Sequence, residues 1–327
     1  MQEISAASFT HRGRRLINED YSGIYEFPEN RVRARRLAIV ADGMGGHNAG
    51  EVASRTAVET IATELADCVL SLQSPVDLAS VVTEAFRTAS EAIFAKASSE
   101  PSCRGMGTTT SVVLILADKA LVANVGDSRI YHLTGEGIEQ LSEDHTALSS
   151  AMKAGYMTEE EITNFPYKHA ITRSLGEESA PEVSIRTIDH FFDSSFIICS
   201  DGLTDVINEK EIYEQVTGNP DLQIAVDNLG RLAYQSGSED NITVVGLEIG
   251  TLRRNENPLI AEGVYPLTKG GGEQKRGKTS AAALALILVL LLLAVISTGL
   301  IYYFGFSEHL YSDRLSGNGA VLNETSQ

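Results

Sequence analysis

Apolar runs that meet an aspartate limit the fold of this chain more than any other feature of its sequence. The run 37–41 ends in Asp42, the run 196–200 ends in Asp201, and Asp240 comes just before a third run. Apolar runs of this length predict buried strands, so each aspartate is expected at the rim of a core. An isolated Asp-Gly pair is ordinary turn chemistry, but its repetition here favours a shared site.

The hydrophobic pattern predicts an α+β fold. Strands are predicted at 4–8, 21–25, 37–41, 108–116, 120–125, 129–133, 137–141, 182–190, 196–200 and 242–247. Helices are predicted at 51–72, 76–97, 147–155, 158–164, 209–216 and 222–235. Short links between successive strands favour antiparallel pairing, because parallel strands need long crossovers.

Composition excludes several classes of function. The chain has 327 residues, of which 43% are hydrophobic, enough for one core of about 250 residues with an appendage left over. A net charge of -18 argues against nucleic-acid binding, because phosphate backbones select basic surfaces. The 3 cysteines are far apart and odd in number, so neither a disulfide framework nor a thiolate metal site is expected.

The C-terminal part of the chain differs in character from the rest. Residues 251–280, rich in Gly, Asn, Pro and charge, are expected to form a flexible linker with a basic cluster before the next segment. Residues 281–306 carry no charge, and as a helix they would reach roughly 38 Å, enough to cross a bilayer. The prediction is a single-pass membrane protein whose domain 1–250 faces the cytoplasm, with the polar tail 307–327 on the opposite side.

Five aspartates lie at or beside the ends of predicted strands: Asp20, Asp42, Asp127, Asp201 and Asp240. Crowded carboxylates raise one another's pKa unless cations neutralise them, so convergence of these side chains predicts metal. Oxygen ligands without Cys or a His set favour Mg²⁺ or Mn²⁺ over zinc. Two such ions sharing a carboxylate can activate water and hold phosphoryl oxygens. Whether the aspartates converge depends on the sheet register, which the sequence leaves open.

A series of short motifs carries a family resemblance over roughly residues 5–250. The motifs are Arg15-x-x-Asn18-Glu19-Asp20, Asp42-Gly43-Met44-Gly45-Gly46-His47-x-x-Gly50-Glu51, Gly107-Thr108-Thr109, Val125-Gly126-Asp127-Ser128-Arg129, Ile171-Thr172-Arg173-Ser174-Leu175-Gly176, Ser200-Asp201-Gly202-Leu203 and Asp240-Asn241-Ile242-Thr243. In order and spacing they resemble the metal-dependent protein phosphatases, the PPM or type-2C family, in its bacterial form. Each motif alone is weak, but the ordered set is specific.

The resemblance implies a four-layer α-β-β-α sandwich and a centre of two Mn²⁺ or Mg²⁺ ions. By position, Asp42 resembles the carboxylate that bridges both ions, and Gly43 a ligand through its carbonyl. Asp201 and Asp240 resemble the remaining ligands of one ion. Asp127 resembles the ligand of a third, weaker ion shared with Asp201.

The resemblance also assigns residues around that centre. Glu19 and Asp20 resemble the family's acidic pair, which acts through bound water. Arg15 resembles the arginine that binds substrate phosphate, a role that suits its planar fork of donors. His47 is the candidate acid that protonates the leaving seryl or threonyl oxygen, with capping of the following helix as the alternative.

Other polar residues are expected to have structural roles. His145 is expected to order a turn, Asp144 to cap the helix after it, and Arg129 to form an ion pair. Arg173 is expected to be structural. The remaining histidines without motif spacing are expected to be ordinary polar residues: His11, His132, His169 and His190.

The leading functional hypothesis is hydrolysis of phosphoserine and phosphothreonine on proteins at the cytoplasmic face of a membrane. Its partners would be phosphorylated proteins and a cognate Ser/Thr kinase. One alternative is a membrane-tethered pseudophosphatase that binds phosphoproteins or regulators without turnover. Another is a phosphatase of the same fold that switches an anti-sigma-type partner.

Overall fold

The computed structural model describes residues 3–27, 34–46, 49–71, 77–155, 161, 165, 170–177 and 180–252. All of them belong to the first of two units into which the chain divides, Met1–Gly270 and Gly271–Gln327. His47 and the segment 281–306, for which the sequence predicts a general acid and a membrane span, lie outside the described residues. None of the described helices is both long and apolar enough to cross a membrane.

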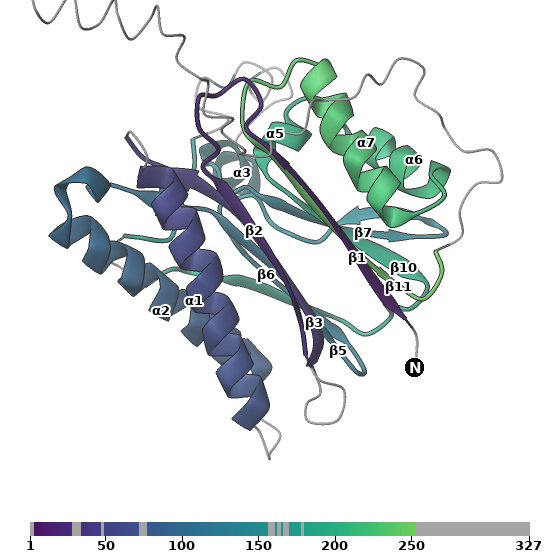
Figure 1. The fold of residues 1–327 in the computed structure, drawn as a ribbon, viewed down its shortest axis with the longest axis horizontal. Coiled ribbons are helices and arrows are strands. Elements are labelled where there is room, and N and C mark those ends of the chain that lie inside the picture. Colours follow the sequence, from purple (N-terminus) through teal and green to yellow (C-terminus); the bar gives the residue numbers. More distant parts are fainter. Residues whose placement is uncertain are drawn as a thin grey trace, which may run out of the picture. The chain divides into compact units, whose positions relative to one another are not determined.

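Two sheets form the middle of the fold (Figure 1). The first sheet contains, in spatial order, β1 (Ile4–His11), β11 (Ile242–Ile249), β10 (Ser194–Cys199), β7 (Arg129–Thr134) and β8 (Gly137–Gln140). The second contains β2 (Asp20–Glu26), β3 (Ala34–Met44), β5 (Thr110–Leu116), β6 (Ala120–Val125) and β9 (Ser184–Ile188), with the short β4 (Gly107–Thr108) paired to β3. Every pairing between these strands is antiparallel, including β5–β6 and β7–β8, for which the short links predicted it.

Helices cover the outer face of each sheet (Figure 1). The pair α1 (Ala49–Ser71) and α2 (Leu78–Ser99) packs on the second sheet. The pair α6 (Glu209–Gly218) and α7 (Leu222–Gln235) packs on the first. The predicted sandwich of two antiparallel sheets flanked by helices is therefore confirmed. The sequence did not predict the short α5 (Asp201–Thr204) or the 3-10 turn η1 (Pro101–Cys103).

Local capping explains where several helices begin. Asp77 accepts a hydrogen bond from the Ala79 amide before α2, and Asp221 accepts one from Ile224 before α7. Asn208 and Glu211 form a reciprocal capping box at the start of α6. Such caps satisfy amides that have no partner within the helix.

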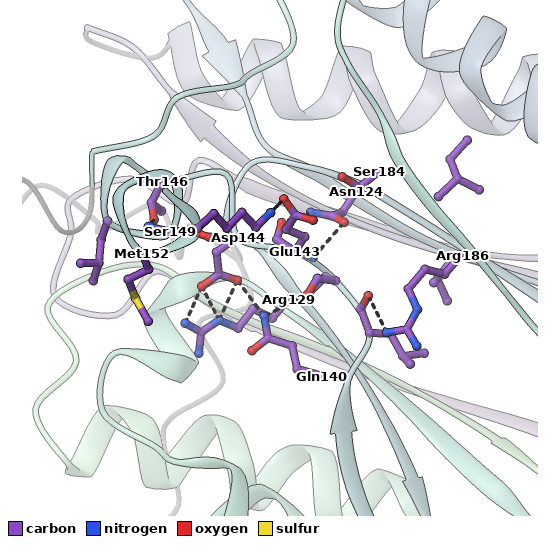
Figure 2. A pocket seen from close by; sticks show the side chains of 16 residues that line it. Asn124, Arg129, Gln140, Glu143, Asp144, Thr146, Ser149, Met152, Ser184 and Arg186 are labelled. Atoms are coloured by element: carbon purple, nitrogen blue, oxygen red, sulfur yellow. Dashed lines mark hydrogen bonds and ion pairs between the residues drawn. The ribbon is translucent and has the colours of Figure 1, made fainter. Parts of the chain in front are cut away.

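The prediction that Asp144 caps the helix α3 (Ala147–Lys153) is wrong. Thr146, not Asp144, accepts the hydrogen bond from the Ser149 amide. Asp144 instead faces Arg129, and their ion pair borders a cavity of about 850 Å³ next to α3 (Figure 2). An ion pair with two parallel hydrogen bonds outcompetes a local cap, because each of its bonds is charge-assisted.

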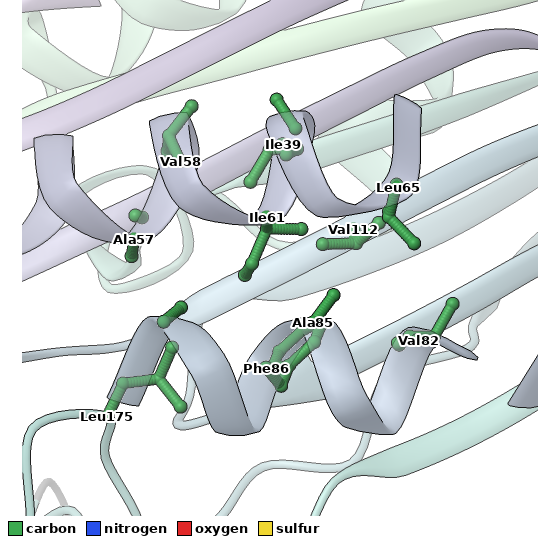
Figure 3. Close-up of a cluster of buried hydrophobic side chains, with 14 of the residues drawn as sticks. Ile39, Ala57, Val58, Ile61, Leu65, Val82, Ala85, Phe86, Val112 and Leu175 are labelled. Atoms are coloured by element: carbon green, nitrogen blue, oxygen red, sulfur yellow. The ribbon is translucent and has the colours of Figure 1, made fainter. Parts of the chain in front are cut away.

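Three apolar cores separate the four layers. In β3, Leu37, Ile39 and Ala41 face the helix pair, whereas Ala38 and Val40 face the other sheet. Because both faces are buried, this strand is continuously apolar rather than alternating. Figure 3 shows the core under the helices, where side chains of α1 and α2 meet Ile39 and Val112 of the sheet.

Candidate active site

The register of β2 and β3 places two aspartates directly opposite each other. Asp20 pairs with Asp42 at the end of this ladder. Opposite residues on antiparallel strands have Cβ atoms about 4.5–5.5 Å apart, a distance at which like charges repel. Asp20 is only 5% exposed, so little water is available to screen this repulsion.

The first sheet brings two further aspartates to the same end of the sandwich. Asp201 begins α5 directly after β10, and Asp240 lies two residues before β11. Between the sheets, the Ser200 hydroxyl donates a hydrogen bond of 2.8 Å to Oδ2 of Asp20. The other carboxylate oxygen of Asp20, Oδ1, is buried and has no hydrogen-bond partner among the described residues. A buried carboxylate oxygen without a partner is costly unless a cation or proton meets it.

Asp127 lies in the turn between β6 and β7 and is 8% exposed. The preceding Gly126 has a φ of +100°, and a Cβ there would lie 2.5 Å from the Thr109 side chain. Both observations require glycine at this position. His145 holds Gly126 on both sides, because its Nδ1 accepts from the Gly126 amide and its own amide donates to the Gly126 carbonyl.

Burial and mutual repulsion perturb the protonation of this cluster. Burial, reinforced by Asp20, Asp201 and other carboxylates, raises the pKa of Asp42 well above its ordinary value. Burial is also the main cause that raises the pKa of Asp20 to about 7 and the pKa of Asp127 to about 7. The pKa of Glu19 is raised too, chiefly by burial. These carboxylates belong to one electrostatic group, which would release protons when a divalent cation binds.

Two glycines bring the backbone of this region into close contact. A Cβ on Gly43 would lie 2.0 Å from the Gly50 carbonyl oxygen, and one on Gly50 would lie 2.5 Å from Oε1 of Glu19. Glu19 accepts a hydrogen bond from the Gly50 amide at 3.1 Å, so its carboxylate lies at the N-terminus of α1. That helix end favours negative charge. The close approach explains the glycine spacing of this motif.

The bridging candidate, Asp42, is held through its backbone. The Asp42 carbonyl accepts from the Thr109 amide at 2.9 Å and from the Thr108 hydroxyl at 2.8 Å, and its amide donates to Oγ1 of Thr109. Thr109 in turn shares a hydrogen bond of 2.7 Å with Ser128, next to Asp127. These bonds fix Asp42 relative to the Asp127 turn.

Arg15 meets the cluster from the loop between β1 and β2. Its Nη2 lies 2.7 Å from Oδ2 of Asp240, and its side chain is 55% exposed. Asn241 holds the same loop, since its amide group donates to the carbonyls of Arg12 and Ile17 and its Oδ1 accepts from the Glu19 amide. The guanidinium therefore stands at the rim, between the carboxylates and solvent.

Several residues that support the aspartates were not predicted from the sequence. Ser200, Thr108, Thr109 and Asn241 all stood in the motifs but were given no role. The available signal was their place next to an aspartate or at the end of a strand. Their partners, however, are distant in sequence and could not be named before the strands were paired.

Structural roles are found for several other polar residues. Arg129 forms the expected ion pair, with its Nη2 2.6 Å from Asp144. His145 orders the Gly126 turn, as expected, and its Nε2 lies 2.9 Å from the Ser184 hydroxyl and 3.2 Å from Nη1 of Arg173.

Three of the four histidines expected to be ordinary polar residues are described. His11 accepts from the Gly13 amide, His132 is buried against Phe196, and His190 is exposed. The fourth, His169, lies outside the described residues.

The donor set fits hard divalent cations. Carboxylate and carbonyl oxygens, such as those of Asp42, Gly43, Asp201 and Asp240, are the type of ligand that Mg²⁺ and Mn²⁺ prefer. Within the described ranges, no three His, Cys, Asp or Glu side chains form a complete ligand group by themselves. A small cation of this type keeps several waters and needs only one or two carboxylates, so an open arrangement is compatible with binding.

Comparison with known proteins shows the family to which this chain belongs. A sequence model of the family "Protein phosphatase 2C" matches residues 9–223. The chain is 34% identical over 240 residues to "Serine/threonine phosphatase stp" of Listeria monocytogenes, covering 73% of this chain and 93% of that protein. It is 36% identical over 234 residues to "Protein phosphatase PhpP" of Streptococcus pneumoniae, covering 71% and 91%.

Solved structures agree as well. The catalytic domain of the phosphatase PstP, solved in complex with two manganese ions, superposes with a TM-score of 0.63 at 32% identity. The match covers 76% of this chain and 100% of that one. From its sequence model, its relatives and its fold, the chain belongs to the protein phosphatase 2C family of bacterial serine/threonine phosphatases.

Proposed function

We propose that this chain hydrolyses phosphoserine and phosphothreonine in proteins at the carboxylate cluster between the two sheets. One observation carries the proposal: Asp20 and Asp42 lie opposite each other, and a buried oxygen of Asp20 has no hydrogen-bond partner in the part of the chain that the structure describes. Such an arrangement is unfavourable in a resting protein and favourable around cations. The manganese ions in the related PstP structure support the same assignment.

Asp42 and the Gly43 carbonyl, with Asp201 and Asp240, are our candidates for holding two Mn²⁺ or Mg²⁺ ions. Glu19 and Asp20 would orient water around them, and Asp127 would serve a weaker third ion with Asp201. When bound, the ions supply Lewis-acid activation of water and neutralise phosphoryl charge.

Two residues are assigned to the substrate. Arg15, exposed at the rim, offers a planar pair of donors that matches two phosphate oxygens. His47, which lies outside the described residues, is our candidate for the acid that protonates the leaving seryl or threonyl oxygen. Between them they would neutralise the phosphate and complete the cleavage of its ester bond.

The test uses the purified full chain and a phosphothreonine peptide. We expect phosphate release with Mn²⁺ and none in EDTA. Asp201→Asn should remove most of this activity while circular dichroism and the unfolding midpoint show an intact fold. Near wild-type turnover by that variant would refute the ligand assignment. Binding of Mn²⁺ and phosphopeptide without any release would instead indicate the pseudophosphatase, a phosphoprotein-binding module.

The domain organisation and the membrane attachment belong to the same proposal. Residues 1–250 would form the catalytic domain, 251–280 a linker with a basic cluster, 281–306 a transmembrane helix and 307–327 a polar tail. The uncharged composition of 281–306 supports this reading. It would hold the enzyme near phosphoproteins and a Ser/Thr kinase at the cytoplasmic face. The full chain should sediment with membranes and resist carbonate extraction, whereas a chain ending at residue 255 should not.

A further inference from the structure

The loop between β1 and β2 presents positive charge beside the acidic cluster. We name residues Arg12–Leu16 the arginine turn. Arg12, Arg14 and Arg15 are all exposed there, in a chain whose net charge is -18. A concentration of one charge sign on a protein of the other sign indicates an interaction surface of opposite charge.

The arginine turn has a fixed conformation. The Arg15 amide donates to the Arg12 carbonyl at 3.1 Å and closes the turn. Gly13 has a φ of +58°, and a Cβ there would lie 1.8 Å from the Asp240 carbonyl oxygen. The Asn241 side chain donates 2.9 Å hydrogen bonds to the carbonyls on both sides of the turn. The backbone of the turn thus lies in close contact with the Asp240 segment.

The three arginines have different local partners. Arg15 pairs with Asp240 and donates to the Glu239 carbonyl, so it is positioned beside the cluster. Arg12 makes one long hydrogen bond to the Leu16 carbonyl, at 3.5 Å. Neither Arg12 nor Arg14 forms an ion pair with another residue in the part of the chain that the structure describes. Among the described residues, the charges of these two exposed guanidinium groups are therefore not neutralised by a carboxylate partner.

From this placement we propose that Arg12 and Arg14 select phosphopeptides with acidic residues next to the phosphorylated residue. The proposal rests on the proposed function, because Arg15 must first hold the phosphate. A peptide anchored there would carry its neighbouring side chains past the turn. Aspartate or glutamate at those positions would pair with the two arginines, whereas lysine would be repelled.

The occupant is a peptide segment rather than a small phosphate compound. Among the described residues, Arg15 is the donor assigned to the phosphate, so Arg12 and Arg14 would contribute to binding when the substrate carries further negative charge. Leu16, which is 90% exposed at the end of the turn, would contact the body of a polypeptide. A free sugar phosphate would reach neither group.

The experiment compares two phosphothreonine peptides that differ only in having aspartate or asparagine on both sides of the phosphorylated residue. Full-length protein with Mn²⁺ should show a higher kcat/KM for the acidic peptide, mainly through KM, and the preference should fall as salt is raised. Replacing one arginine should reduce the preference by about two- to five-fold, the range for an exposed ion pair. Arg12→Gln/Arg14→Gln should abolish it and leave kcat for the asparagine peptide unchanged.

A matched control removes the same charge elsewhere. Lys119 lies in the β5–β6 turn, at the end of the sheet opposite to Asp42. Lys119→Gln should therefore keep the preference for the acidic peptide. Loss of the preference in this control would mean that overall charge, not the arginine turn, determines selection, and would overturn the proposal.

Peptide binding, measured by fluorescence anisotropy, separates this proposal from the proposed function. If no peptide releases phosphate, the proposed function fails. The arginine turn would still be supported as a docking surface if the wild-type protein binds the acidic peptide more tightly than the asparagine peptide and Arg12→Gln/Arg14→Gln does not. Equal kcat/KM and equal binding for the two peptides, or a preference that survives Arg12→Gln/Arg14→Gln, would overturn it.

Discussion

Replacing Asp20 by asparagine should stabilise the metal-free protein, although the aspartate stands at the centre of the site. Asparagine has the same shape and can still accept the Ser200 hydrogen bond. It removes the charge that opposes Asp42 across the β2–β3 ladder, and its amide group can donate toward that carboxylate. We therefore expect a gain in stability from a substitution that should abolish function.

The size of the gain follows from the pKa of Asp20. Its ordinary value is 3.8, and burial raises it to about 7. This change corresponds to a ceiling of about 4 kcal/mol in the free energy of unfolding. Because Asp20 shares protonation with neighbouring carboxylates, and the new amide must find a partner, we expect about 2 kcal/mol.

The folded and unfolded pKa values of Asp20 also determine how this gain in stability changes with pH. Folded Asp20 holds its proton up to about pH 7, whereas the unfolded residue loses it near pH 3.8. The stability from this group is therefore fully present below the unfolded pKa and is lost as pH rises through the folded pKa. The advantage of Asp20→Asn should thus be largest above pH 7 and should disappear toward pH 4.

Urea unfolding in EDTA at several pH values measures this difference. Asp118→Asn, an exposed aspartate in the β5–β6 turn, is the matched control and should change stability by less than about 0.5 kcal/mol. With added Mn²⁺ the wild-type protein should become more stable than Asp20→Asn, because only the wild-type site gains the full free energy of metal binding. An Asp20→Asn protein that is less stable than wild type in EDTA above pH 7 would refute the argument.

Three further substitutions test other parts of the structure. His47→Gln should lower kcat for phosphopeptides by about 10²-fold or more, but much less for an aryl phosphate whose leaving group needs no proton; equal losses on both substrates would exclude the acid role. Gly13→Ala should cost more than about 1 kcal/mol in urea unfolding and weaken Mn²⁺ binding in calorimetry, because its Cβ would collide with the Asp240 carbonyl; unchanged Mn²⁺ affinity would contradict the close approach. Phe86→Ala, in the fully buried core of Figure 3, should cost about 3–5 kcal/mol while the KM of the remaining folded protein stays the same, and a shifted KM would show that this core reaches the site.

Much of the fold could be predicted because local patterns and long-range packing agree. The continuous apolar run of β3 predicted a strand buried on both faces, and the two cores that contain it are the physical reason. Short links predicted antiparallel pairing. The aspartates at the ends of these strands indicated metal chemistry before any pairing was known.

The contacts that build the site could not be predicted in the same way. Nothing local in the sequence indicates that Asp20 faces Asp42, since a register shift of one residue would turn these side chains to opposite faces. The Arg15–Asp240 pair joins residues 225 positions apart. Asp144 was expected to cap the following helix, but its actual partner, Arg129, comes from β7.

The unfavourable features of this fold are gathered at one end of the sandwich. Away from that end, apolar side chains fill all three spaces between the four layers. At that end, carboxylates with raised pKa values meet, one of their buried oxygens has no hydrogen-bond partner, and glycines bring backbone segments into contact. Local rules of stability are broken most often where a protein binds or reacts. Because the hydrogen bonds from Ser200, Thr108 and Thr109 hold the aspartates in place despite their repulsion, a cation would meet a preorganised set of oxygens and would bind without first ordering the loops.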